Sequence, residues 1–208
     1  TIRKNQKKWL SSNKNLKILD LGCSNKNFWQ EANYFADIHD YKSDFESLNL
    51  NYTQIKPDEK LPFKDKEFDY VICTHVIEHV NHPMAFKEEI ERIGKSGYIE
   101  LPTRLNDNMV FGCDEDIYGH KWWFEFDDDE NKLIFAKKID ALEKFVSVGS
   151  IFNLTEIFDD SLIIQVFWSD NINMEQREPY KLEKKISFLS IVRKYFSKNI
   201  RTQISKLK

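Results

Sequence analysis

The feature that most constrains the fold of this 208-residue chain is the stretch Phe-Asp-Tyr-Val-Ile-Cys at residues 68–73. It is rich in β-forming residues on both faces, which is typical of parallel strands whose two faces are covered by helices. Similar apolar stretches occur at residues 17–22, which end at a glycine turn, and at 97–101. Shorter strands are predicted at residues 34–37 and 52–55. The sequence therefore predicts a mostly parallel sheet.

A helix is predicted between two of these strands. Residues 84–93 carry Phe86, Ile90 and Ile93 at helical spacing, and residues 81–83 provide a start signal. A strand, a helix and a further strand in this order favour right-handed crossovers, which place helices over the sheet. We expect a doubly wound α/β fold with its site at the carboxyl ends of the strands.

After residue 103 the pattern changes. Residues 121–126 and 132–135 flank an acidic turn and predict a β-hairpin insertion. Residues 139–158 have mainly helical spacing, and 161–168 predict another apolar strand. We expect one main domain over residues 1–176, since a single core usually serves about 100–200 residues.

The charge is distributed unevenly. Residues 177–208 contain ten Lys/Arg and two Asp/Glu, a net +8, which leaves −11 for residues 1–176. Apolar residues recur in this tail at near-helical intervals and predict a basic amphipathic helix. Such a helix fits an anionic membrane surface or an acidic partner; alternatively, it docks on the acidic body or self-associates. Nucleic acid binding is disfavoured because the body is acidic.

The cysteines and the hydropathy indicate a cytoplasmic location. Cys23, Cys73 and Cys113 are far apart and form no CxxC pair, so we expect neither a disulfide framework nor a metal site. Cys23 and Cys73 are interpreted as small buried apolar residues. We see neither an apolar run of about 18–20 residues nor a secretory signal at the first residues given. The prediction is a cytoplasmic protein, with membrane contact only through the tail.

One group of motifs contains the residues that are expected to bind a ligand and to catalyse a reaction. Asp20-Leu21-Gly22-Cys23-Ser24 is followed by an acid at Asp37, by Leu-Pro-Phe at 61–63, and by a block at 68–80 that ends Thr-His-Val-Ile-Glu-His-Val. In these motifs the chain resembles the class I S-adenosylmethionine-dependent methyltransferases, in particular their type 11-like domains. The resemblance covers about residues 16–103. It implies a Rossmann-like fold, methyl transfer and S-adenosylmethionine as the cofactor.

The resemblance also implies residue roles, with the cofactor half at about residues 14–103. Gly22 lets the backbone approach the amino-acid end of the cofactor. A carboxylate at Asp37, or at Asp40 if the second strand runs longer, accepts hydrogen bonds from both ribose hydroxyls. The other expected cofactor-binding residues are Asp20, which organises the glycine turn, Ser24 at the family's second glycine, Phe63 as an adenine wall, and Thr74.

The turn after Gly22 departs from the family pattern. The third glycine is missing, and only 17 positions separate Asp20 from Asp37, too few for the usual helix between the first two strands. A dinucleotide site needs a glycine-rich turn that opens a helix, whose N-terminus holds the pyrophosphate. S-adenosylmethionine has no phosphate and tolerates a shortened turn. An NAD(P)-binding oxidoreductase is therefore the weaker alternative.

The expected catalytic residues are two histidines. His75 follows the fourth strand and is the expected general base, and His79 is the second candidate because it lies one helical turn later. In a competing interpretation, Glu78 and His79 cap a helix or form an ion pair. A further alternative is a methyltransferase fold that has lost catalysis and serves as a binding module; a tail-anchored membrane scaffold is another.

An acceptor or lid region is predicted at about residues 103–136. Its expected substrate-binding residues are Arg104, His120 and Trp122, whose rings and polar groups suit a sugar or another ring. Alternatively, residues 122–126 form the core face of the hairpin. The region is similar to methyltransferase-like proteins of bacterial surface-glycan synthesis. We therefore expect a small-molecule or glycan acceptor with a hydroxyl or amine group.

Overall fold

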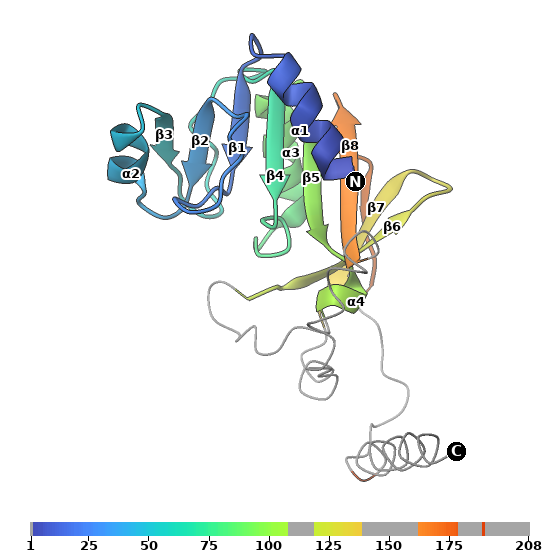
Figure 1. The fold of residues 1–208 in the computed structure, drawn as a ribbon. Coiled ribbons are helices and arrows are strands. Elements are labelled where there is room, and N and C mark those ends of the chain that lie inside the picture. Colours follow the sequence, from blue (N-terminus) through green and yellow to red (C-terminus); the bar gives the residue numbers. More distant parts are fainter. Residues whose placement is uncertain (1, 108–118, 139–161, 179–188, 190–208) are drawn as a thin grey trace, which may run out of the picture.

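The computed structural model describes residues 2–107, 119–138, 162–178 and Leu189. Its centre is a six-stranded sheet with the order β3-β2-β1-β4-β5-β8 (Figure 1). The first five of these strands are parallel, and β8 pairs antiparallel with β5. The mostly parallel sheet is thus confirmed. Its strands are β1 (Ile18–Leu21), β2 (Tyr34–Asp37), β3 (Asn51–Gln54), β4 (Tyr70–Thr74), β5 (Ser96–Pro102) and β8 (Ile163–Ser169).

Helices cover both faces of this sheet. In Figure 1, α1 (Ile2–Ser12) crosses in front of the strands and α3 (Pro83–Ile93) lies behind them. Two core clusters match these two layers: one contains Leu10 of α1, and the other contains Ile90 and Ile93 of α3. The predicted helix at 84–93 is α3, with a proline in its first turn, where no intrahelical N–H bond is lost. Two shorter helices are α2 (Lys42–Ser47) and α4 (Arg104–Asp107).

The strands distribute their side chains between the two clusters by alternation. Leu19 and Leu21 of β1 belong to the α3 cluster, whereas Ile18 belongs to the α1 cluster. The same alternation holds in β4, where Val71 and Ile72 separate. Because successive strand residues face opposite sides, a strand that is apolar throughout is buried on both faces. This is the doubly wound arrangement that residues 68–73 predict.

The connection from β1 to β2 contains no helix. Residues 22–33 form turns and bends, in agreement with the short spacing between Asp20 and Asp37. The loop is held from inside, since the backbone N–H of Trp29 donates a hydrogen bond of 2.7 Å to the Asp20 carboxylate. The indole of Trp29 is itself buried in the α1 cluster.

A second, smaller sheet has the order β6-β7-β9. The predicted hairpin is formed by β6 (Trp122–Asp127) and β7 (Lys132–Lys137), which pair antiparallel. The unpredicted β9 (Met174–Gln176) pairs parallel with β7. Phe124 and Phe135 of the hairpin are buried in the α3 cluster, which agrees with a core face on the hairpin.

Two predicted helical segments lie outside the described residues. These are residues 139–158 and the basic tail at 177–208, of which only Arg177, Glu178 and Leu189 are described. Within the described ranges, no helix combines the length and the apolar character needed to cross a bilayer.

Candidate functional site

A cavity of about 1070 Å³ opens at the carboxyl ends of the parallel strands. Gly22 after β1, Asp37 at the end of β2 and His75 after β4 all line it. This is where loops gather in a doubly wound sheet. The volume is sufficient for a ligand the size of a nucleoside conjugate.

Gly22 and Asp37 lie side by side in this cavity. In the parallel pairing of β1 with β2, Leu21 is opposite Ala36, so the next residue of each strand comes together at the sheet edge. The N–H of Gly22 also donates a hydrogen bond of 2.7 Å to the carbonyl of Ala36. The two positions on which the cofactor prediction depends are therefore neighbours.

The structure favours Asp37 over Asp40 as the carboxylate of this cavity. Asp37 lines the cavity, accepts a hydrogen bond of 2.8 Å from the N–H of His39, and has its pKa raised by burial. Asp40 is exposed, does not line the cavity, and accepts a hydrogen bond from the N–H of Lys42. The second strand ends at Asp37, so the longer strand that would favour Asp40 does not form.

Gly22 is required by the fold itself. Its φ is +85°, and a Cβ at this position would lie 2.1 Å from Cγ2 of Val76. Any other residue would be strained and would collide with this neighbour. The close approach that we expected from the cofactor is thus made by Val76, which also lines the cavity.

Asp20 does not lie in the cavity with Gly22 and Asp37. It is buried, it does not line the cavity, and its carboxylate accepts the hydrogen bond from Trp29. Burial raises its pKa to about 7, while the Trp29 N–H and the charge of Arg3 act in the opposite direction. Its visible role is to hold the loop that follows Gly22.

Three other expected cofactor residues lie outside the cavity lining. The hydroxyl of Ser24 accepts a hydrogen bond of 2.9 Å from the N–H of Asn27 within an exposed turn. The ring of Phe63 packs edge-on against Phe68, with centroids 5.0 Å apart, so it faces the core and does not form a cavity wall. Thr74 ends β4, paired in register with Glu100.

One wall of the cavity is formed by the loop after β3, which includes Leu61 of the expected Leu-Pro-Phe motif, and not by Phe63. Ile55 and Leu61 line the cavity together with the residues between them, including Asp58 and Glu59. The loop directly follows β3, so its position at the carboxyl edge of the sheet was the available signal.

His75 lies between two buried carboxylates. Its Nε2 is 3.5 Å from Glu100 Oε1 and its Nδ1 is 3.4 Å from Glu78 Oε1, while its own side chain is 45% exposed. These carboxylates, Glu100 first, raise the pKa of His75 to about 9. An imidazolium cannot accept a proton, so this geometry does not favour the expected role of His75 as a general base at neutral pH.

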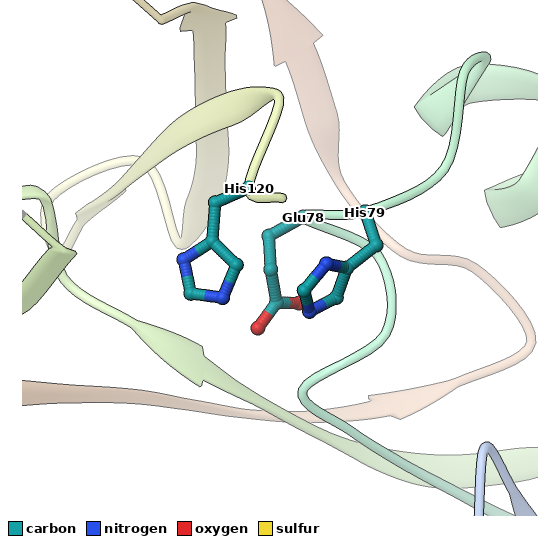
Figure 2. A group of neighbouring side chains, drawn as sticks. All are labelled: Glu78, His79 and His120. Carbon is teal, nitrogen blue, oxygen red and sulfur yellow. The ribbon is translucent and has the colours of Figure 1, made fainter. Parts of the chain in front are cut away.

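Glu78, His79 and His120 form a cluster beside the cavity (Figure 2). One ligand atom from each residue lies within 4.8 Å of the others, and the two imidazole rings meet nearly at right angles with centroids 4.5 Å apart. Glu78 is fully buried, and neither of its carboxylate oxygens has a hydrogen-bond partner in the part of the chain that the structure describes. His79 also lines the cavity. His79 and His120 are 41 positions apart, so no local motif in the sequence indicated this grouping.

In the described structure, the side chains of Arg104 and Trp122 contact neighbouring protein groups. Arg104 forms an ion pair with Glu125 and lies over the ring of Trp123, 5.8 Å from its centroid. The indole N–H of Trp122 donates a hydrogen bond of 2.8 Å to the carbonyl of Val80. Neither residue lines the cavity. Residues 108–118 of the expected lid lie outside the described residues.

Comparison with known proteins identifies the family. Residues 3–146 match the family model described as a methyltransferase domain. An uncharacterized protein of Methanocaldococcus jannaschii is 28% identical over 173 residues, which cover 73% of this chain and 71% of that protein.

Two solved structures are similar to part of this chain. An S-adenosylmethionine-dependent methyltransferase from Thermotoga maritima is 17% identical with a TM-score of 0.38, over 43% of this chain and 45% of that one. The YcgJ protein from Bacillus subtilis is 16% identical with a TM-score of 0.36, over 42% and 44%. The chain thus matches less than half the length of these two structures.

Proposed function

The chain belongs to the methyltransferase domain family, and from this premise we propose that its cavity holds S-adenosylmethionine against Gly22 and Asp37. When bound there, the cofactor would supply a methyl group on a positively charged sulfur. The acceptor would enter the same cavity from the side lined by His75 and His79.

The observation that supports this proposal best is the pairing of Gly22 with Asp37 at adjacent strand ends in one cavity. A carboxylate has two oxygens and can accept hydrogen bonds from both hydroxyls of a ribose. The N–H of His39 contacts only one oxygen of Asp37. The apolar side chains of Ile55 and Leu61, further along the same cavity, suit a purine ring.

The loop after Gly22 distinguishes this proposal from dinucleotide binding. A pyrophosphate is normally held by the N–H groups at the start of a helix. Residues 22–33 form no helix, so the cavity lacks that anion site next to Gly22. S-adenosylmethionine, which has no phosphate, does not require it.

For methyl transfer, the protein mainly has to align the acceptor with the methyl group and to exclude water. We propose that the acceptor is a hydroxyl or amine of a small molecule or a glycan, and that His75 and His79 contact its reacting group. Both histidines line the cavity. A charged His75 would orient an acceptor oxygen as a hydrogen-bond donor.

Calorimetric titration with S-adenosylhomocysteine, NAD and NADP tests the cofactor. We expect binding of S-adenosylhomocysteine only, and an Asp37→Ala variant should lose about 1.5–3 kcal/mol of binding free energy, the cost of hydrogen bonds to a charged group. Asp40→Ala is the matched control, because Asp40 is exposed and outside the cavity. Tight binding of NAD alone, or equal affinity of both variants and the wild type, would refute the proposal.

A further inference from the structure

We propose that Glu78, His79 and His120 form a binding site for a divalent transition-metal ion at the edge of the cavity. The three side chains converge from two segments far apart in the sequence, as Figure 2 shows. Two imidazoles and one carboxylate are ligands that zinc, iron and manganese accept. Magnesium and calcium prefer sites made of oxygen ligands, so this set disfavours them.

The buried carboxylate is the strongest argument for a cation here. Glu78 is 0% exposed, and within the described residues neither oxygen receives a hydrogen bond. Its nearest charged neighbour is the ring of His75 at 3.4 Å, which is shared with Glu100. Burial of an ionised carboxylate costs several kcal/mol unless it is paired or binds a metal. The pairing with His75, which is shared with Glu100, offsets only part of this cost, and an ion between Glu78 and the two histidines would lower it further.

The distances are close to those of a formed site. The ligand atoms lie within 4.8 Å of one another, whereas two ligands that each sit about 2.0–2.2 Å from a tetrahedral zinc ion are roughly 3.3–3.6 Å apart. Side-chain movements of about 1 Å would therefore close the three residues on an ion.

Hydrogen bonds hold the two ligand-bearing segments together. The N–H of Lys121 donates to the carbonyl of Glu78 at 2.8 Å, and the Lys121 ammonium donates to the Asn81 side chain at 2.6 Å. The indole of Trp122 adds its bond to the carbonyl of Val80. The residue after His120 is thus fixed directly to Glu78. A site whose ligands are already held in place loses little entropy when it binds an ion.

The position of the site indicates what the ion would bind. Three protein ligands leave at least one coordination position for water or substrate, and His79 lines the cavity in which we place the acceptor. A metal ion lowers the pKa of a bound hydroxyl, whereas a neutral amine is nucleophilic without such help. This step rests on the proposed function, and it selects a hydroxyl acceptor over an amine.

The resulting reaction balances without a further reagent. The acceptor oxygen would form the new bond to the methyl carbon, and the carbon–sulfur bond would break with its electron pair left on sulfur. The hydroxyl proton would leave to solvent water. The ion changes no oxidation state.

Metal binding can be measured without any acceptor. We expect the chelator-treated full chain to bind one Zn²⁺ in competition with a chromophoric chelator, and to bind Co²⁺ with visible absorption bands. Glu78→Gln and His120→Ala should each weaken Zn²⁺ binding by more than the 10–100-fold that is typical of losing a supporting contact around a metal site. His82→Ala removes a cavity histidine outside the cluster and should leave the affinity unchanged. Equal affinity in all four proteins would overturn the site.

A second titration separates this proposal from the proposed function. S-adenosylhomocysteine binding is measured on the same four proteins after chelation, and it also reports that the variants are folded. Binding of S-adenosylhomocysteine without Zn²⁺ binding refutes the metal site but still supports the proposed methyltransferase function. Zn²⁺ binding that depends on the cluster supports the site even if S-adenosylhomocysteine does not bind.

Discussion

At the scale of single residues, Asp20 is a buried carboxylic acid that holds the loop after Gly22. The residue is 2% exposed, and within the described residues its carboxylate accepts one hydrogen bond, from the N–H of Trp29. Burial disfavours the charged form, and this raises the pKa from 3.8 to about 7. The residue therefore binds a proton in the folded protein at pH values at which the unfolded chain has released it.

This shift predicts a pH-dependent stability. Between about pH 4 and pH 7 the folded state holds more protons than the unfolded state, so the free energy of unfolding should fall as the pH rises. An Asp20→Asn variant keeps an oxygen for the Trp29 N–H but has no charge to bury. At pH 8 it should be more stable than the wild type by up to about 4 kcal/mol, since each pKa unit is worth about 1.36 kcal/mol.

Urea unfolding of both proteins at pH 4, 6 and 8 measures this difference. The gain should shrink towards pH 4, where the unfolded state of the wild type also begins to bind the proton. Asp40→Asn is the control, because Asp40 is exposed and should show no such trend. A gain or loss that is the same at all three pH values would contradict the role assigned to Asp20.

Which site residues could be predicted depended on where they lie. Gly22 and Asp37 end adjacent parallel strands, so their meeting follows from the strand pattern alone. Phe63 lies in a loop whose carbonyls at 61 and 63 are both held by the guanidinium of Arg92. The direction of its ring depends on this long-range contact, and no local pattern shows it.

At the scale of elements, the strands were predictable and the first helix was not. The central strands are short apolar runs that end at clear turns. In α1 only Gln6 and Leu10 are buried, and Trp9 is 46% exposed, so its apolar periodicity is weak. The contact of the 120–122 segment with the turn at 78–81 is likewise a tertiary feature, made through hydrogen bonds that no sequence period encodes.

That contact gives a prediction for the hairpin. Trp122→Phe should retain most of the edge-on packing against Phe135, whose centroid is 5.4 Å away, but lose the hydrogen bond to Val80. The free energy of unfolding should fall by about 0.5–1.5 kcal/mol, the usual worth of one hydrogen bond. Because β6 begins only two residues after His120, Zn²⁺ affinity should fall as well, although no ligand is changed.

Chemical denaturation and the chelator competition assay measure the two effects. Leu133→Val is a suitable control: it removes one methylene from the buried face of β7 and should cost a similar stability without touching the 78–81 turn. Equal loss of Zn²⁺ affinity in both variants would show that the hydrogen bond does not position the cluster.

At the scale of the whole molecule, the cavity lies where several elements of the fold meet. Its lining includes the ends of β1 and β2, the loops after β3 and β4, and Ala85 and Phe86 of α3. A ligand in this cavity contacts several elements at once. It should therefore stabilise the folded chain as a unit.

Thermal unfolding with saturating ligand measures this stabilisation. At a concentration of 100 times its Kd, S-adenosylhomocysteine should raise the free energy of unfolding by about 2.7 kcal/mol, which corresponds to roughly 5–10 °C in Tm for a chain of this size. NAD at the same concentration should leave Tm unchanged, because residues 22–33 offer no helix N-terminus to a pyrophosphate. With Asp37→Ala, the same shift should require about 10–100 times more S-adenosylhomocysteine. A shift with NAD that equals the shift with S-adenosylhomocysteine would contradict the exclusion of dinucleotides, and an unchanged ligand requirement in Asp37→Ala would mean that the ligand is recognised without the carboxylate at the end of β2.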